Sequence, residues 1–413
     1  MKIIKIILLF LCVCNLNLKS TFVIFAQTLD KRSIFLQQQK IRDKYLHGKI
    51  SQKYKKIIPI FGYNSLKNPL LQDIYNEILK TAEYIPDFKN INNNYTNEIN
   101  INIGTTTDQI TQILRAFEND HPEIFWLSKH YQIISSNSYK KLRIFSEYSP
   151  TEIYKFKKEI NQALDSFLND IPEKLTEYQR ELWIHDKFIN SCKYNIRTYS
   201  QKLTTDSNIY GALVLKKCVC EGYAKAMKLL LNSVGINSEI IIGYSKSELH
   251  AWNAVKIDGK FYHLDSTWDS NINNKLRNHD YFNLDNSTIL KDHAIMSFDC
   301  VNDNLNLKTF TSSKYNYFNV EAVKFSSWKI FENNIIKKLN NIASSHDECI
   351  HILFKNNKEI ENFLKNMSNF IYFILETFNS NSEIKFDIHK SISYNISLNQ
   401  NVLSIKLSYY RRQ

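Results

Sequence analysis

Three residues whose side chains together support thiol chemistry occur in order along the middle of the chain: Cys220, His250 and Asp265. A cysteine can attack a carbonyl carbon, a histidine can take the thiol proton, and a carboxylate can orient that histidine and stabilise its charged form. A cysteine taken alone is more often a buried structural residue. The assignment therefore depends on whether the surrounding elements bring the three side chains together.

A helix is predicted directly after Cys220. Apolar residues recur at helical spacing over Glu221–Val234, and Gly235 follows where a left-handed C-terminal cap belongs. Cys220 is then at the helix N-terminus, where the positive end of the helix dipole favours a thiolate. The unpaired amides of the first turn could also bind the oxyanion of an acyl-transfer intermediate.

Downstream, the sequence predicts a β-hairpin. The strand patterns Ala251–Ile257 and Lys260–Leu264 flank the dipeptide Asp258-Gly259, which favours a two-residue type I′ turn. Such a turn places Ile257 opposite Lys260 and so fixes the register of the whole hairpin.

This register places His250 near Asp265. Counted back from the turn, Trp252 is opposite Asp265 and His250 is opposite Thr267, so His250 and Asp265 are diagonal neighbours on one face. His263 shares that face but lies nearer the turn, and we interpret it as structural. A one-residue bulge would change this prediction.

These residues occur in blocks that resemble a known family. Cys220–Ala224, His250–Asn253 and His263–Asp269 are similar in order and spacing to the core of the transglutaminase-like superfamily, which has a papain-like fold. Tyr210–Leu213 and Asp280–Asn283 resemble secreted bacterial proteins with this domain. The resemblance implies that Cys220 is the nucleophile, His250 the base and Asp265 the third member of a triad.

The site expected from these arguments needs no metal or organic cofactor. The backbone amide of Cys220, helped by Tyr210, is expected to stabilise the oxyanion. Trp252 and Trp268 are expected to form walls of the cleft, with plain core packing as the alternative for each.

The fold is predicted to be α+β, with the nucleophile helix packed on an antiparallel sheet. The expected divisions are a signal peptide over 1–26, a mostly helical region over 27–170, a transglutaminase-like core over 171–300 and an accessory α+β region over 301–413. Asn90–Asn102 is expected to be a loop and Pro172–Ser191 a helix, with His185 packed in the core. His293 and Cys300 are expected in irregular segments.

The N-terminus has the pattern of a secretory leader. Lys2 and Lys5 precede the apolar run Ile7–Val13, and Ala26 offers a small residue for cleavage. The chain is therefore expected to be secreted or cell-surface associated, with an uncleaved anchor as the alternative. No later transmembrane segment is expected.

The net charge of +12 is spread along the chain. No block of basic residues interleaved with aromatics is present, so nucleic acid is not an expected partner, whereas contact with an anionic cell surface fits the charge. Lysine-rich composition alone could also account for it.

Five cysteines follow the predicted leader, and an odd number leaves at least one thiol free. Cys218 stands two residues before Cys220. It is interpreted as a bystander, with a redox cap on Cys220 or a pairing with Cys192 as alternatives.

The sequence thus predicts a secreted thiol enzyme that acts on a protein or peptide amide, with hydrolysis slightly favoured over cross-linking. A shared triad does not decide between water and an amine as acceptor. The alternatives are an inactive transglutaminase-like binding module at the cell surface and a structural adaptor like some kyphoscoliosis-peptidase-like relatives.

Overall fold

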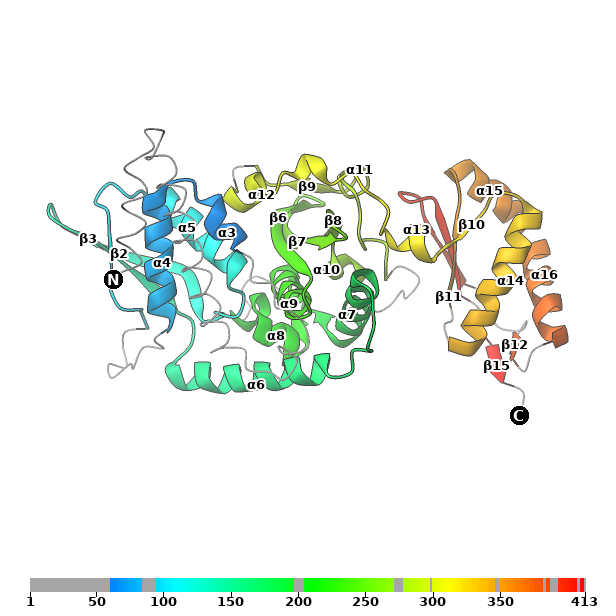
Figure 1. Ribbon diagram of the computed structural model, residues 1–413, viewed down its shortest axis with the longest axis horizontal. Helices are drawn as coiled ribbons and strands as arrows, with labels where there is room; N and C mark the ends of the chain where they lie inside the picture. The colour runs from blue at the N-terminus through cyan, green and yellow to red at the C-terminus, as the bar shows by residue number, and fades with distance from the viewer. Residues whose placement is uncertain are drawn as a thin grey trace, which may run out of the picture. The chain divides into compact units, whose positions relative to one another are not determined.

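The computed structural model describes residues 60–83, 94–196, 204–270, 278–297, 299–345, 349–381, 384–386, 393–406 and 409–411. The predicted leader over 1–26 lies outside these residues. The described residues all belong to one compact unit, and Figure 1 shows the arrangement of their elements. Among the helices of the described residues, none combines the length and the apolar character needed to span a bilayer.

The N-terminal region contains a sheet as well as helices. Its elements are α3 (Phe61–Ser65), α4 (Pro69–Glu83), β1 (Ile99–Ile101), α5 (Thr107–Asp120), β2 (Leu127–Ser135), β3 (Lys140–Ser146) and α6 (Pro150–Leu168). The three strands pair in the order β1-β3-β2. The predicted loop Asn90–Asn102 is therefore wrong at its end, because Ile99 and Ile101 pair with β3 and are buried.

The central region is built around an antiparallel sheet in the order β8-β7-β6-β9. Its elements are α7 (Glu177–Ser191), β4 (Lys193–Tyr194), η3 (Thr204–Ser207), α8 (Ile209–Leu213), β5 (Lys217–Cys218), α9 (Cys220–Ser233), β6 (Asn237–Ser245), β7 (Glu248–Ile257), β8 (Lys260–Leu264), α10 (Ser266–Asp269), α11 (Asn286–Ile289) and β9 (His293–Ile295). Helix α9 packs against the sheet through Ala224, which contacts Ile240 and Ala251 (Figure 1). The predicted α+β class, with the nucleophile helix on an antiparallel sheet, is confirmed.

Two helix boundaries follow from capping. Helix α7 begins at Glu177 and not at Pro172, because Thr176 caps it in a reciprocal capping box with Gln179. Helix α9 begins at Cys220 as predicted, and Gly235 after its end has φ 82°. An L-residue with a side chain avoids that conformation, which accounts for the glycine.

The hairpin has the predicted register from its turn to the pair of Asn253 with Leu264. Asp258 and Gly259 both have positive φ, Ile257 pairs with Lys260, and the ladder continues to Leu264. Beyond Leu264 the chain turns into α10, so the expected pairs of Asp265 and Thr267 with β7 do not form. Asp265 instead caps α10.

The C-terminal region is a second α+β assembly. Its elements are α12 (Cys300–Asn304), η5 (Leu307–Thr309), α13 (Tyr317–Glu321), β10 (Val323–Lys324), α14 (Trp328–Ser345), β11 (Cys349–Leu353), α15 (Asn357–Lys365), α16 (Met367–Asn381), β12 (Ile384–Phe386), β13 (Ser393–Ser397), β14 (Val402–Lys406) and β15 (Tyr409–Arg411). The sheet β10-β11-β14-β13 packs on α14, α15 and α16 through an apolar cluster that includes Phe331, Ile350 and Phe363. The prediction of irregular structure at His293 and Cys300 is wrong, since these residues begin β9 and α12.

Candidate active site

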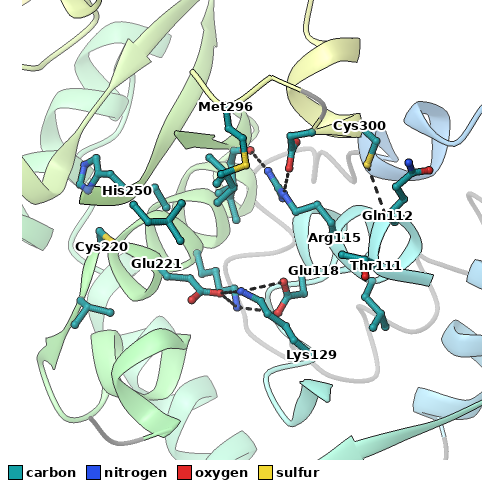
Figure 2. A pocket seen from close by; sticks show the side chains of 18 residues that line it. Thr111, Gln112, Arg115, Glu118, Lys129, Cys220, Glu221, His250, Met296 and Cys300 are labelled. Atoms are coloured by element: carbon teal, nitrogen blue, oxygen red, sulfur yellow. Dashed lines mark hydrogen bonds and ion pairs between the residues drawn. The ribbon is translucent and has the colours of Figure 1, made fainter. Parts of the chain in front are cut away.

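Cys220 is the first residue of α9 and is partly exposed. Val219, which precedes it, provides no side-chain cap, so the first-turn amides are not covered by a capping group. Cys220 lines a cavity of about 530 Å³ together with His250, and Figure 2 shows the two side chains at one end of this cavity. A thiol is thus placed at a helix N-terminus beside an imidazole.

His250 is positioned by Asp265. The Nε2 atom of His250 lies 2.7 Å from Oδ2 of Asp265, and both side chains are nearly or fully buried. Burial lowers the pKa of His250, but the charge and hydrogen bond of Asp265, together with a hydrogen bond to Cys220, outweigh it and raise that pKa to about 10. His250 is therefore an imidazolium at neutral pH, the form that stabilises a neighbouring thiolate.

Asp265 has both of its carboxylate oxygens occupied. Oδ1 accepts the backbone N–H groups of Thr267 and Trp268, which makes Asp265 the N-cap of α10. Oδ2 faces His250 and His293. Burial raises the pKa of Asp265, but these histidines outweigh it and hold the pKa well below its usual range. The carboxylate is therefore ionised and fixed in orientation.

His293 is the residue that the sequence reasoning missed. Its Nε2 lies 3.1 Å from Oδ2 of Asp265, and its Nδ1 lies 2.6 Å from Oδ1 of Asp292. The hydroxyl of Tyr281 donates to the other oxygen of Asp292 at 2.6 Å. His293 reaches this place because β9 pairs with β6, at Ser245. No periodicity in the sequence marks that pairing. The only local signal is the dipeptide Asp292-His293.

Trp252 and His263 form the support behind His250. The Trp252 ring stacks on the His250 ring with centroids 5.9 Å apart, and its Nε1 donates to Nδ1 of His263 at 3.1 Å. Burial lowers the pKa of His263 to about 4, so this histidine is neutral. His263 is thus structural, as predicted, and Trp252 is buried behind the imidazole and does not line the cavity.

The other expected site residues have different outcomes. Trp268 is half-buried near His293 with the Lys246 ammonium 4.1 Å from its ring centroid. Tyr210 is not placed to stabilise the oxyanion as expected, because its hydroxyl donates to Glu159 at 2.7 Å and its ring stacks on Phe156. Its side chain is engaged by α6, and Tyr210 does not line the cavity.

His185 is a core histidine, as predicted. It is fully buried, with Nε2 3.1 Å from Asp269 and Nδ1 3.1 Å from Asp186. His185, Asp186 and His279 bring three possible metal-ligand atoms close together, and so do His250, Asp265 and His293. In both groups the hydrogen bonds between the side chains account for the arrangement.

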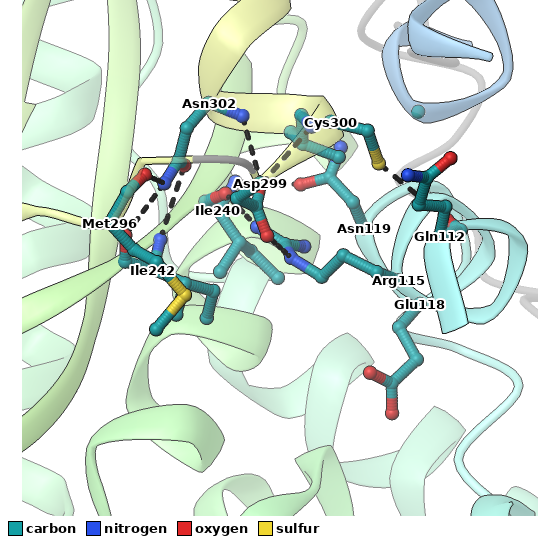
Figure 3. Close-up of polar contacts among 12 residues, drawn as sticks. Gln112, Arg115, Glu118, Asn119, Ile240, Ile242, Met296, Asp299, Cys300 and Asn302 are labelled. Carbon is teal, nitrogen blue, oxygen red and sulfur yellow. Dashed lines mark hydrogen bonds and ion pairs between the residues drawn. The ribbon is translucent and has the colours of Figure 1, made fainter. Parts of the chain in front are cut away.

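The cavity next to Cys220 has a wall from the N-terminal region. Helix α5 contributes Leu114, Arg115 and Glu118, and β6 and β7 contribute Ile240, Ile242 and Leu249 on the other side. Figure 3 shows Arg115 reaching across, where its Nε donates to Asp299 at 2.8 Å and its guanidinium also donates to the Ile240 carbonyl at 2.8 Å. The bond to Ile240 joins α5 to the sheet, and the bond to Asp299 joins it to the N-cap of α12.

The charged groups of the cavity wall are paired with one another. Besides the His250 imidazolium, whose charge is paired with Asp265, three cations and three carboxylates line it, namely Arg115, Lys129, Lys225, Glu118, Glu221 and Asp299. Their ion pairs have N···O distances between 2.8 and 3.6 Å. Figure 2 shows Lys129 and Glu118 joined in this network below the cavity. The wall therefore offers no excess charge of either sign.

One segment of the chain is similar to a known family. Residues 165–266 match the model of the transglutaminase-like superfamily, so the resemblance expected from the sequence is confirmed for this segment. The human kyphoscoliosis peptidase is 26% identical over 141 residues, which cover 30% of this chain and 21% of that protein, and the mouse protein is 26% identical over 125 residues, which cover 27% and 18%. The chain thus spans about a fifth of the length of these relatives.

Part of the chain is also similar to two solved structures. A TGase has a TM-score of 0.25 and 13% identity, covering 41% of this chain and 51% of its own. A candidate cysteine protease from Cytophaga hutchinsonii has a TM-score of 0.22 and 17% identity, covering 33% and 61%. These scores are too low to bear on the fold.

Proposed function

We propose that this chain is a cysteine-dependent acyl-transfer enzyme that acts on amide bonds of a protein or peptide. The observation that carries the proposal is the placement of Cys220 at the uncapped start of α9, beside an imidazole that the buried carboxylate of Asp265 holds in its charged form. A structural cysteine needs neither a cavity nor a charged partner.

The mechanism follows from the positions of the protons. Nε2–H of His250 donates to Asp265, so Nδ1 faces Cys220 and already carries the thiol proton in a thiolate–imidazolium pair. The thiolate attacks the amide carbon, and the backbone N–H of Cys220 donates to the oxyanion. His250 returns the proton to the leaving amine, which departs and leaves a thioester. An acceptor then attacks the thioester, with His250 as base, and the thiol is regenerated.

The cavity indicates the kind of group that the substrate places next to the scissile bond. Because the wall charges are paired with each other, a charged side chain would lose its hydration without gaining a free partner. Ile242, Leu249 and Met296 instead offer apolar contact. We infer a preference for an uncharged side chain in the acyl donor.

Hydrolysis is favoured over cross-linking, because water reaches the site without a dedicated amine pocket. The peptidase name of the human relative points the same way. The second candidate is a surface binding module without activity, and it would be favoured by a Cys220 thiol of ordinary reactivity. Secretion is part of the proposal and rests on the leader pattern over 1–26; N-terminal sequencing of the exported protein tests it.

The deciding experiment is the pH dependence of iodoacetamide alkylation, resolved by site with mass spectrometry. Cys220 is expected to react well below pH 8 and at least tenfold faster than Cys300 at pH 6.5. His250→Ala should abolish that advantage. His130→Ala is the matched control, since the His130 side chain is 84% exposed. Equal labelling of Cys220 and Cys300 at every pH would favour the binding module.

If Cys220 is activated, the acceptor can be identified. Casein and peptide substrates are incubated with and without a fluorescent primary amine. Release of new amino termini or ammonia without amine incorporation supports hydrolysis, whereas incorporation of the amine into casein identifies a cross-linking enzyme.

A further inference from the structure

Two buried thiols lie in contact beneath the first turn of the nucleophile helix. The sulfur atoms of Cys192 and Cys218 are 3.6 Å apart, and neither side chain has measurable exposure. The two residues are 26 positions apart in the sequence, so their contact results from the fold and not from local spacing.

The backbone around the pair is firmly connected. Cys192 is the C-cap of α7, and its N–H donates to the Phe188 carbonyl. The following strand β4 runs parallel to β5, with Tyr194 paired to Cys218, and the N–H of Asn195 donates to the Cys218 carbonyl at 2.9 Å. The two sulfur atoms are thereby held at a separation that a side-chain rotation can close.

The pair is directed toward α9 and away from the cavity. A Cβ atom added to Gly222 would lie 3.0 Å from Sγ of Cys218, and Cys218 does not line the cavity that contains Cys220. The sulfur in contact with Cys218 is that of Cys192, which favours this pairing over a redox cap on Cys220.

We propose that Cys192 and Cys218 are a disulfide-forming pair, which cross-links the end of α7 to the strand that leads into the nucleophile helix. The oxidant is a disulfide of the glutathione class. The Cys192 thiolate attacks it, forms a mixed disulfide and releases one thiol; Cys218 then loses its proton and displaces the second thiol. Two protein thiols and one oxidant disulfide become one protein disulfide and two small thiols.

The environment of the pair fits this order of events. The hydrogen bond between the two thiols lowers the pKa of the Cys192 thiol, whereas burial raises the pKa of the Cys218 thiol well above its ordinary value. Cys192 is accordingly the first to attack. The cross-link leaves Cys220 as a free thiol, so the inference is independent of the proposed activity.

The test uses the full chain, purified reduced and equilibrated with oxidised glutathione for several days, with and without 2 M urea to promote local opening. Peptide mapping without reduction is expected to show Cys192 joined to Cys218, with Cys220 still alkylated. The oxidised protein should have a Tm about 5 °C higher than the reduced protein, because the bond closes a loop of intermediate length.

Cys192→Ser should remove this Tm difference, and Cys300→Ser, the control on a thiol outside the pair, should retain it. Cys192 and Cys218 recovered as free thiols in both samples, or Cys218 joined to Cys220, would overturn the proposal. Peptide mapping reads the bond directly, so a variant that folds poorly does not affect the conclusion.

Discussion

Asp265→Asn is the substitution that separates the charge of the third residue from its structural role. Asparagine keeps a side-chain oxygen that can accept the Thr267 and Trp268 amides and so cap α10. It removes the negative charge 2.7 Å from Nε2 of His250. The fold is therefore expected to persist while the electrostatics of the site change.

The magnitude follows from the pKa of His250. A rise from 6.5 to about 10 corresponds to about 5 kcal/mol in favour of the imidazolium, at about 1.4 kcal/mol per tenfold change. Burial opposes this rise, so the pKa of His250 should fall below 6.5 once the charge of Asp265 is removed. Cys220 would then lack a cationic partner at neutral pH.

The assay is the alkylation profile of Cys220 between pH 4 and 10. In Asp265→Asn, the pH of half-maximal alkylation should rise by two or more pH units, and amide cleavage should fall by about 10³-fold. Asp258→Asn is the matched control on the same hairpin, because Asp258 is exposed and has a positive φ that asparagine tolerates. An Asp265→Asn profile that coincides with the wild type would refute the electrostatic role of Asp265.

The same pair predicts how stability depends on pH. The pKa of His250 is raised in the folded state, so its contribution is fully present below pH 6.5 and is lost as the pH rises through about 10. Wild-type protein should lose stability relative to Asp265→Asn over that interval in urea titrations. A constant difference from pH 6 to 10 would contradict the assignment of the charge.

Three further substitutions test other contacts. His293→Gln should lower kcat about tenfold with little change in KM and shift the pH profile of cleavage, because it weakens a hydrogen bond that orients the triad carboxylate; an unchanged profile would make this histidine merely structural. Gly222→Ala should lower the free energy of unfolding in urea by about 2 kcal/mol or more, since its methyl group would lie 2.7 Å from Cβ of the buried Cys218. Gly104→Ala is the control and should be nearly neutral, because its methyl group would lie 3.3 Å from the flexible Asn102 side chain. Lys228→Met should cost about 3 kcal/mol by calorimetry, because it leaves the buried Glu239 without its cation; a smaller loss would show that Glu239 takes up a proton instead.

The parts of the site that the sequence predicted are those set by local structure. The start of α9 follows from an apolar period that begins just after Cys220, and the hairpin register follows from the Asp258-Gly259 turn. Together these placed His250 beside Asp265. The contact forms although Asp265 leaves the strand, because capping α10 still directs its other oxygen toward His250.

The residues that the sequence did not place depend on contacts between distant segments. His293 reaches Asp265 only through the pairing of β9 with β6, and Cys192 reaches Cys218 only through the short parallel pairing of β4 with β5. Two- and three-residue strands leave little periodicity to detect. Tyr210 was misplaced for a related reason, since α6, and not the nucleophile helix, supplies the partner of its hydroxyl.

The cavity shows why the substrate cannot be transferred from relatives. The matched segment covers residues 165–266, yet α5 forms one wall, and Arg115 fastens it to Asp299 and to the Ile240 carbonyl (Figure 3). Both α5 and Asp299 lie outside that segment. The triad lies within the matched segment, whereas one wall of the cavity comes from outside it. A change in α5 can therefore alter the accepted side chain while Cys220 and its partners stay in place.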